Sequence, residues 1–320
     1  MEIILFGIGF VLLIKGADYL VEGSSALARK LGVSALIIGL TVVALGTSMP
    51  EMVVNIMAAI SGSGDIAFGN IIGSNMSNIL LILGVSSIIA NLDIKRSTIW
   101  KEIPFACLAV IVLLLLANIP SLDNLPINYL LRTEGIILIL FFVIFLLYIF
   151  GLAKENKFKV EGEKPEIKKY SSRIIFLMIA SGLTAMYFGG NWIVGGAVYL
   201  ARKFGLSEFF ISATIIAVGT SLPELITAVV AVRKKNMDLA VGNVVGSNIF
   251  NIFWILGITS VIRPIKFPDF ANVDLTILLL TTVLLFLFMF MGKRHELKRW
   301  QGMIFIVLYA VYVVSLFFRG

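Results

Sequence analysis

The sequence Gly-Thr-Ser-Met-Pro-Glu at residues 46–51 returns as Gly-Thr-Ser-Leu-Pro-Glu at residues 219–224. Sliding the chain along itself by 173 positions aligns residues 16–84 with residues 189–257 without a gap. Within the stretch that begins at Thr41, about 20 of 44 positions are identical. Hydrophobicity alone does not produce such agreement, so the chain contains an internal duplication.

The composition around these motifs is that of a membrane protein. Of 320 residues, 59% are hydrophobic and 14% are charged, whereas a soluble domain carries about 25% charge. A transmembrane helix needs about 20 apolar residues, and runs such as 136–150 are apolar at nearly every position, which excludes alternating barrel strands. The apolar stretches lie at 3–28, 33–60, 66–90, 98–117, 130–152, 173–201, 207–232, 239–262, 271–291 and 300–318. The sequence therefore predicts an all-α integral membrane protein with ten transmembrane helices.

The duplication divides these ten helices into two halves of five. Because each half holds an odd number of spans, the second half must enter the membrane upside down relative to the first. We expect a first half at 1–152 with its repeat at 16–84, a cytoplasmic linker at 153–172, and a second half at 173–320 with its repeat at 189–257. Equivalent residues of two such inverted repeats meet near the middle of the membrane.

The basic residues predict the orientation. Most of the 26 lysines and arginines lie in short clusters between apolar stretches, and they gather on one side if both termini are outside and the central loop is cytoplasmic. The positive-inside rule favours this arrangement in the cell membrane, although Arg202 and Lys203 count against it. The net charge of +7 is thus explained by topology, and we expect no nucleic-acid partner. The single cysteine, Cys107, excludes an internal disulfide.

The duplicated motif places an acid in the middle of a span. Glu51 and Glu224 each stand where a carboxylate costs about 2.5–3.5 kcal/mol, and helix packing needs neither. Pro50 removes a backbone donor and clashes with the carbonyl of Gly46, so the helix is expected to break there and release carbonyl oxygens. Thr47 precedes Glu51 by four positions and shares its helix face. Hydroxyl, carboxylate and carbonyl oxygens therefore converge, once in each half.

A second duplicated segment supplies further oxygen atoms. Gly-Asn-Ile-Ile-Gly-Ser-Asn at 69–75 matches Gly-Asn-Val-Val-Gly-Ser-Asn at 242–248, and Asn78 and Asn251 follow at equivalent positions. Taken singly, these side chains fit interhelical hydrogen bonds; as a duplicated set beside two buried acids, they are better interpreted as ligands. Calcium takes six to eight oxygen ligands, whereas zinc or copper would prefer histidine or cysteine. Two carboxylates neutralise one divalent ion.

These motifs resemble the alpha-repeats of sodium/calcium exchangers, over nearly the whole chain. The resemblance implies that the two motif glutamates bind calcium, helped by main-chain carbonyls at the motif threonines, and that flanking alanine carbonyls and serines form sodium sites while two asparagines complete the centre. The implied ion ligands are Glu51, Glu224, Thr47, Thr220, Ser48, Ser221, Ser74, Ser247, Asn78, Asn251, Ala44 and Ala217. No catalytic residue, prosthetic group or obligatory protein partner is implied.

The function implied by this resemblance is secondary active exchange of sodium for calcium by alternating access. A ratio of three sodium ions to one calcium ion belongs to the same implication and would make transport electrogenic. Potassium-dependent relatives carry aspartate at the position of Asn251, which argues against potassium cotransport. The proton/calcium branch shares the architecture but lacks the duplicated Thr-Ser-x-Pro-Glu, and it is the second hypothesis.

Two other classes of protein fit less well. A cation channel needs a continuous pore, usually built from subunits around an axis, and pseudo-symmetry in the membrane plane does not provide one. An intramembrane enzyme would need a Ser/His pairing, paired aspartates or a phosphate-binding loop, and the sequence shows no such pattern.

Three charged residues in the first span do not follow the duplication. Lys15, Asp18 and Glu22 are spaced by three and four positions, so we expect them to pair along one face of a tilted helix near the membrane interface. Their repeat equivalents differ in chemistry: Phe188, Asn191 and Gly195. A symmetric site therefore does not include them.

Asp65 and Asp238 are repeat-equivalent acids, and each begins an apolar stretch. A carboxylate is favourable at a helix N-terminus, so we expect both to cap the helices that follow. A role in ion binding is not expected for either residue.

Overall fold

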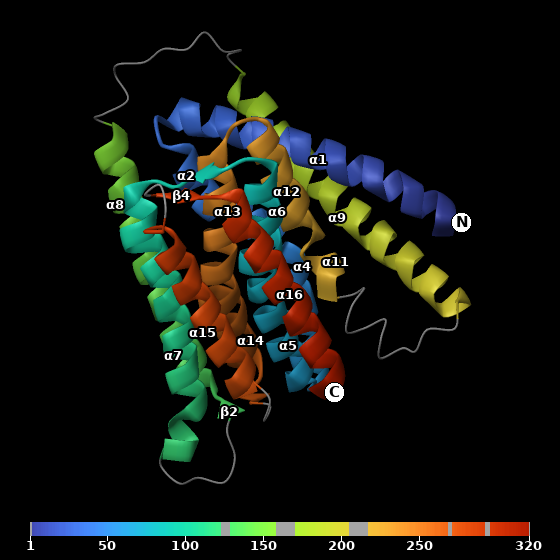
Figure 1. The fold of residues 1–320 in the computed structure, drawn as a ribbon, viewed down its shortest axis with the longest axis vertical. Coiled ribbons are helices and arrows are strands. Elements are labelled where there is room, and N and C mark those ends of the chain that lie inside the picture. The colour runs from blue at the N-terminus through green and yellow to red at the C-terminus, as the bar shows by residue number, and fades with distance from the viewer. Residues whose placement is uncertain are drawn as a thin grey trace.

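The computed structural model describes residues 2–122, 129–157, 170–204, 217–267, 271–291 and 295–319. Nearly all of these residues are helical (Figure 1). The first half contains α1 (Glu2–Leu31), α2 (Ala35–Ile38), α3 (Ala44–Thr47), α4 (Met49–Ser61), α5 (Gly64–Met76), α6 (Leu83–Ile89), α7 (Ile103–Leu122) and α8 (Arg132–Lys157). The second half contains α9 (Ser172–Lys203), α11 (Ala217–Thr220), α12 (Leu222–Arg233), α13 (Met237–Ile249), α14 (Gly257–Ile262), α15 (Ala271–Phe288) and α16 (Arg299–Arg319).

The helices reproduce the predicted spans. In the described residues, eight helices are long and apolar enough to cross a membrane, and a ninth span is made by two helices that meet at a bend of 46°. The remaining predicted span, 207–232, is the seventh in chain order. Its first part falls within residues 205–216, which lie outside the described part, and the rest of it forms α11 and α12. The predicted linker at 153–172 also falls mostly outside, and its boundaries stay a prediction.

The two motif helices break at equivalent serines. Ser48 separates α3 from α4 with φ −84° and ψ 8°, and Ser221 separates α11 from α12 with φ −85° and ψ 3°. Each break is followed by the motif proline, which lacks the N–H that a continuous helix would use at that position. The expected helix break is therefore present in both repeats, with nearly the same backbone geometry.

In the part of the chain that the structure describes, four stretches of π-helix interrupt the spans: η1 (Gly39–Val43), η2 (Ser77–Ile82), η3 (Thr98–Glu102) and η6 (Phe250–Leu256). The sequence analysis does not predict them, because a π-helix differs from an α-helix in its hydrogen-bond pattern and carries no compositional signature. Two of them, η2 and η6, occupy equivalent positions and contain Asn78 and Asn251. The asparagines thus sit where the helix is locally widened.

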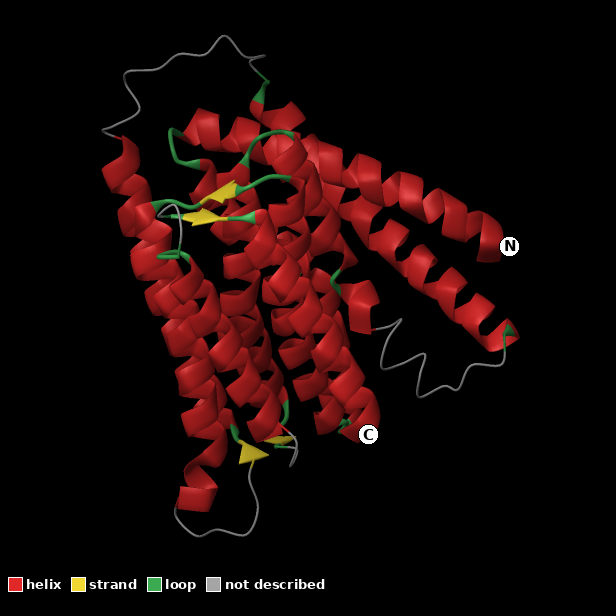
Figure 2. Cartoon of the chain, in the orientation of Figure 1, coloured by secondary structure: helices red, strands yellow, loops and turns green. Residues whose placement is uncertain are grey.

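Two short strand pairs depart from a purely helical fold. β1 (Leu92–Asp93) pairs antiparallel with β4 (Glu296–Leu297), and β2 (Tyr129–Leu130) pairs antiparallel with β3 (Ile265–Lys266). Each pair joins a loop of one half to a loop of the other, and the two pairs lie at opposite ends of the molecule (Figure 2). We refer to these as the β1/β4 end and the β2/β3 end. The first is predicted to face the cytoplasm.

The helices form a tightly packed core with a separate pair at its side. The spans at 64–89 and 237–262 are the most enclosed, with 78% of their residues buried, against 22–28% for α1, α8, α9 and α16. α8 packs against α14, and α16 packs against α6, so each half covers the other.

The separate pair consists of α1 and α9, which run side by side and diverge from the core (Figure 1). Glycines bring their backbones together: a Cβ atom added at Gly16 would lie 2.8 Å from the carbonyl oxygen of Gly182, and one added at Gly189 would lie 2.8 Å from that of Gly9. Small residues of this kind allow close helix packing in membranes. α1 and α9 contact each other far more extensively than either contacts the core.

Candidate ion-binding site

The two motif acids lie at the N-termini of broken helices inside the protein. Glu51 is in the first turn of α4 and Glu224 is in the first turn of α12, and both are 0% exposed. They lie close enough to interact electrostatically. The positive end of each helix dipole favours a carboxylate at this position, but it balances only part of the charge. Two buried acids from opposite repeats therefore share one centre.

The serines at the helix breaks point across this centre. Ser48 and Glu51, like Ser221 and Glu224, have the spacing of a capping box, in which the serine hydroxyl normally bonds a backbone N–H of its own helix. Neither serine makes that bond. The Ser48 hydroxyl instead donates to Oε1 of Glu224 in the other repeat, at 3.1 Å. The Ser221 hydroxyl lies 3.4 Å from that of Ser74. The serine hydroxyls at the two breaks thus form contacts across the centre instead of capping their own helices.

Further hydroxyl groups surround the carboxylates. Ser74 of α5 donates to Oε1 of Glu51 at 3.3 Å, and Thr220 is a further hydrogen-bonding neighbour of Glu51. Thr47 is near Glu224 and donates to the side-chain oxygen of Asn243 at 3.0 Å. Each acid therefore has a hydroxyl neighbour from the opposite half of the chain.

Four asparagines form a symmetric ring between the repeats. The Asn78 amide donates to Oδ1 of Asn248 at 2.9 Å, and the equivalent Asn251 amide donates to Oδ1 of Asn75 at 2.8 Å. Asn75 and Asn248 also donate to each other's main-chain carbonyls, at 3.3 and 3.5 Å. These bonds fix the amide groups of Asn78 and Asn251, whose side-chain oxygens accept no hydrogen bond from the described part of the chain.

Several buried oxygen atoms have no hydrogen-bond partner among the described residues. Five of them belong to the predicted ion ligands: Oε2 of Glu51, Oε2 of Glu224, Oδ1 of Asn78, Oδ1 of Asn251 and the Ser247 hydroxyl. Buried polar atoms are rarely left unpaired, and the carboxylate and amide oxygens are acceptors only. A dehydrated hard cation would satisfy these acceptors and offset the two charges.

The structure brings the predicted site residues together, with two qualifications. The Ala44 carbonyl is already used, because it accepts from the Ser48 amide at 3.0 Å and from the Thr47 hydroxyl at 3.4 Å. Ala217 begins α11, but its side chain lies outside the described part. The remaining ten residues are on segments that meet at the two helix breaks.

Sequence reasoning missed residues that orient the site. Asn75 and Asn248 are part of the duplicated segment, and this repetition was the available signal, but only the structure shows that they hold Asn251 and Asn78. The sequence analysis also missed a fully buried acid outside the motifs, Glu102. It is 0% exposed, lies away from the motifs and accepts a hydrogen bond from the Tyr148 hydroxyl.

The charged residues that were not expected to bind ions have other partners than predicted. Asp18 and Glu22 do not pair along α1; both approach Nζ of Lys234, at 3.2 and 4.0 Å. Asp65 and Asp238 are in the first turns of α5 and α13, but the N-cap positions belong to other residues: Ser63 and Asn236. Asp238 forms an ion pair with Lys95 at 2.6 Å. Capping by the aspartates was therefore the wrong prediction, because the helices begin two residues earlier.

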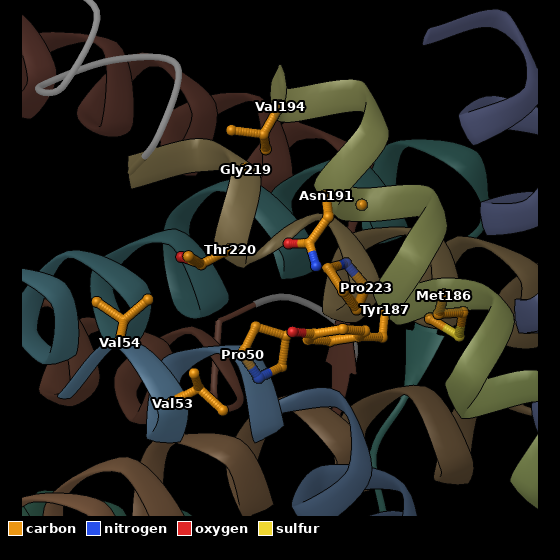
Figure 3. Close-up of a pocket in the computed structure, with 11 residues that line it drawn as sticks. Pro50, Val53, Val54, Met186, Tyr187, Asn191, Val194, Gly219, Thr220 and Pro223 are labelled. Atoms are coloured by element: carbon orange, nitrogen blue, oxygen red, sulfur yellow. The ribbon is translucent and has the colours of Figure 1, made fainter. Parts of the chain in front are cut away.

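Two cavities adjoin the site on one side. One, of about 170 Å³, is bounded by Pro50, Thr220 and Pro223 and by Tyr187 and Asn191 of α9 (Figure 3). A second, of about 500 Å³, reaches Gly46 and Thr47. Their walls are residues of α3, α4, α9, α11 and α12. These cavities give the candidate site a connection to the space between α9 and the core.

The fold and the site together define a secondary cation transporter, in which inverted repeats and broken helices surround midplane acids. Residues 1–151 and 174–318 match the family described as sodium/calcium exchanger protein. The chain therefore belongs to the sodium/calcium exchanger family.

Individual relatives match over nearly their full length. The chain is 35% identical to the putative antiporter CaxA of Alkalimonas amylolytica and 30% identical to the sodium/calcium exchanger MaX1 of Methanosarcina acetivorans, in each case over 97% of both proteins. The solved structure of the sodium-calcium exchanger NCX_Mj superposes with a TM-score of 0.81 at 31% identity, over 98% of both chains.

These findings confirm the predicted fold class, an all-α integral membrane protein with ten transmembrane helices in two inverted repeats. The protein is a cation/calcium exchanger, and its family is one of transporters and not of enzymes. The short strand pairs are a departure from helix that the sequence did not indicate.

Proposed function

We propose that this protein exchanges sodium for calcium by alternating access and that Glu51 and Glu224 bind the calcium ion between them. The observation that carries the proposal is the pair of fully buried carboxylates, one from each repeat, each with one oxygen that has no partner among the described residues. Two negative charges match one divalent cation. The free oxygens of Asn78 and Asn251 supply further ligands of the type that calcium prefers.

Sodium ions use the remaining oxygen atoms of the same centre when calcium leaves. The proposed sodium ligands are the hydroxyls of Ser48, Ser74, Ser221 and Ser247 and the carbonyls at Ala44 and Ala217, while the carbonyls at Thr47 and Thr220 complete the calcium site. The MaX1 relative carries the name of a sodium/calcium exchanger, which supports sodium and calcium as the two exchanged ions. Three sodium ions for one calcium ion would move one net positive charge in each cycle.

The test is calcium uptake into proteoliposomes loaded with sodium. Outward gradients of sodium, potassium and protons are imposed in turn, and we expect uptake to require sodium alone. An interior-positive potential should speed this uptake, because it favours the outward movement of positive charge, with about 2.3 kcal/mol per elementary charge for each 100 mV. Uptake that needs potassium together with sodium, or that a proton gradient drives without sodium, would select one of the alternative exchangers. Voltage-independent uptake would contradict the electrogenic ratio.

We also propose that both termini are outside and the central loop is cytoplasmic in the cell membrane. The basic clusters at Lys95 and Arg96 and at 233–235 support this orientation. Alkaline phosphatase fused after residue 320 should be active, because this enzyme requires an extracytoplasmic location, and a fluorescent protein fused there should be poorly fluorescent. The reverse pattern would overturn the orientation without affecting the ion assignment.

A further inference from the structure

The path from the site toward the β2/β3 end is open beside α9. The smaller cavity is lined by Met186, Gly190, Asn191 and Val194, with Asn191 facing the motif proline Pro223 (Figure 3). Few contacts join α9 to α4 in this region. An ion that has passed the α9 side chains would therefore reach Thr220 and the centre.

The equivalent path toward the β1/β4 end is closed. The offset of 173 residues relates Met186, Gly190 and Val194 to Leu13, Ala17 and Val21 of α1. The first two pairs are buried in both repeats, but Val194 is only partly buried at the cavity wall, whereas its equivalent Val21 is 1% exposed. There α1 packs directly along α12, the equivalent of α4. At the position of Val194 and Val21, the helix thus forms a cavity wall in one repeat and a buried contact in the other.

A charged cluster seals the closed side. Lys234, the C-cap residue of α12, pairs with the carboxylates of Asp18 at 3.2 Å and Glu22 at 4.0 Å, and it donates to the main-chain carbonyl of Asp18 at 3.2 Å. The Asn236 amide adds a bond to the Ser25 hydroxyl at 3.0 Å. Tyr170 donates to Glu22, and this hydrogen bond raises the pKa of Tyr170, so its hydroxyl stays a donor. α1 is therefore held to the α12–α13 turn by several polar contacts.

The cluster has no counterpart at the other end. The repeat equivalents of Asp18, Glu22 and Lys234 carry no charge: Asn191, Gly195 and Ser61. The three charged side chains are about 40% exposed, so each ion pair contributes modestly and breaks readily. Such a contact suits a closure that opens in every transport cycle and is present on one side only.

We propose that Asp18, Glu22 and Lys234 form a one-sided latch that holds the path at the β1/β4 end closed. When the latch opens, Asp18 lines the mouth of that path, as Asn191 lines the other mouth in the present conformation. A mouth that holds a carboxylate attracts cations more strongly than one that holds an amide. This inference rests on the proposed alternating access but not on which ions are exchanged.

The experiment measures the accessibility of two equivalent positions. In a Cys107→Ala background, single cysteines replace Val21, behind the latch, and Val194, on the cavity wall. Their rates of reaction with a methanethiosulfonate reagent are measured in nanodiscs, where the reagent reaches both faces. We expect the cysteine at position 194 to react much faster than the one at position 21.

Lys234→Gln should then shift both rates in opposite directions. Loss of the two modest ion pairs should raise the rate at position 21 and lower the rate at position 194, each by about 2–5-fold. Lys234→Arg keeps the charge and should stay within about twofold of the parent. Lys235→Gln removes the adjacent charge, which pairs with no acid in the described part of the chain, and should change neither rate.

Unchanged labelling rates in Lys234→Gln would overturn the proposed latch. A rise in the rate at both positions would also overturn it, because it would indicate a general loosening of the protein. Because labelling requires no ion flux, this result is independent of the transport assays. If sodium fails to drive calcium uptake while the labelling shifts as expected, the ion assignment fails and the latch stands. If sodium drives calcium uptake but the labelling rates do not shift as expected, the latch alone fails.

Discussion

The two repeats are alike at the centre and different around it. Glu51 and Glu224 occupy the same helix turn, and the asparagine ring obeys the same two-fold relation. Away from the centre, Asn55 of the first repeat corresponds to Ala228 of the second. Residues of the centre that recur can serve the ion in both orientations of the site, whereas residues that differ can act on one side only. The comparison therefore separates ion binding from side-specific control.

The difference at Asn55 changes how each acid is supported. The Asn55 amide donates to the Ala67 carbonyl at 3.2 Å, and its side-chain oxygen accepts from Asn70 at 2.6 Å. Asn70 in turn donates to the main-chain carbonyl of Glu51 at 3.3 Å. In the second repeat, Asn243 replaces Asn70, and its amide nitrogen has no partner among the residues that the structure describes. The helix turn of Glu51 is thus cross-linked to α5, and the turn of Glu224 lacks this connection.

The largest expected effect comes from breaking the central symmetry. Glu51→Gln and Glu224→Gln should each abolish calcium transport, because each keeps the side-chain size and removes half of the charge that balances the ion. Calcium-45 uptake into proteoliposomes measures this, with size-exclusion elution as the check on folding. Asp65→Asn, which changes a repeated but exposed acid, is the matched control and should transport normally. Near-normal uptake by either glutamine variant would refute the assignment of the site.

A second effect should depend on pH. Calcium must displace any protons on the two carboxylates, so its affinity should fall on acidification, by up to about tenfold per pH unit for each displaced proton. Isothermal titration calorimetry at mildly alkaline and mildly acidic pH measures the change. Equal affinities at both pH values would mean that the carboxylates are not the ligands.

The asparagine ring offers a test of the symmetry itself. Asn78→Ala and Asn251→Ala each remove one free amide oxygen and one cross-repeat hydrogen bond, so each should weaken calcium binding by about tenfold, as expected for a contact to a charged group. The two variants serve as controls for each other. Losses that differ by more than about fivefold would show that the ion lies closer to one repeat.

The smallest effect is expected at the asymmetric support. Asn55→Ala removes one hydrogen-bond donor from the Ala67 carbonyl and one of the two acceptors of the Asn70 amide, and it should lower the free energy of unfolding by about 1–3 kcal/mol. Transport should be reduced only modestly, because the ion ligands remain. Thermal unfolding in detergent measures the loss of stability. A variant with unaltered stability and abolished transport would instead make Asn55 a participant in ion movement.

The spans and the acids could be predicted because the relevant signals are local or duplicated. Twenty apolar residues mark a helix wherever they occur, and Pro50 and Pro223 mark a break by the same local rule. Repetition of the motif then identified Glu51 and Glu224 as partners without any knowledge of their distance. These predictions required no knowledge of three-dimensional contacts.

Contacts between the repeats could not be predicted in the same way. The bond from Ser48 to Glu224 replaces a local cap that the sequence favours, and only the proximity of the two breaks explains the replacement. The partner of Asp18 and Glu22 lies more than 200 residues away, at Lys234, and local spacing suggested an intrahelical pairing instead. The positions at which α5 and α13 begin, before Asp65 and Asp238, depend on loop geometry. The two aspartates alone do not specify that geometry.

The strand pairs have a consequence for the synthesis of the chain. β1 and β2 belong to the first half, but their partners β4 and β3 emerge from the ribosome roughly 200 and 135 residues later. Until then, the newly inserted first half exposes unpaired backbone groups on both faces of the membrane, and such strand edges invite pairing with other chains. The second half closes first the β2 edge and then the β1 edge as β3 and β4 are synthesised. Separately synthesised halves should therefore assemble with each other, and an isolated first half should be prone to aggregation and to degradation by quality control.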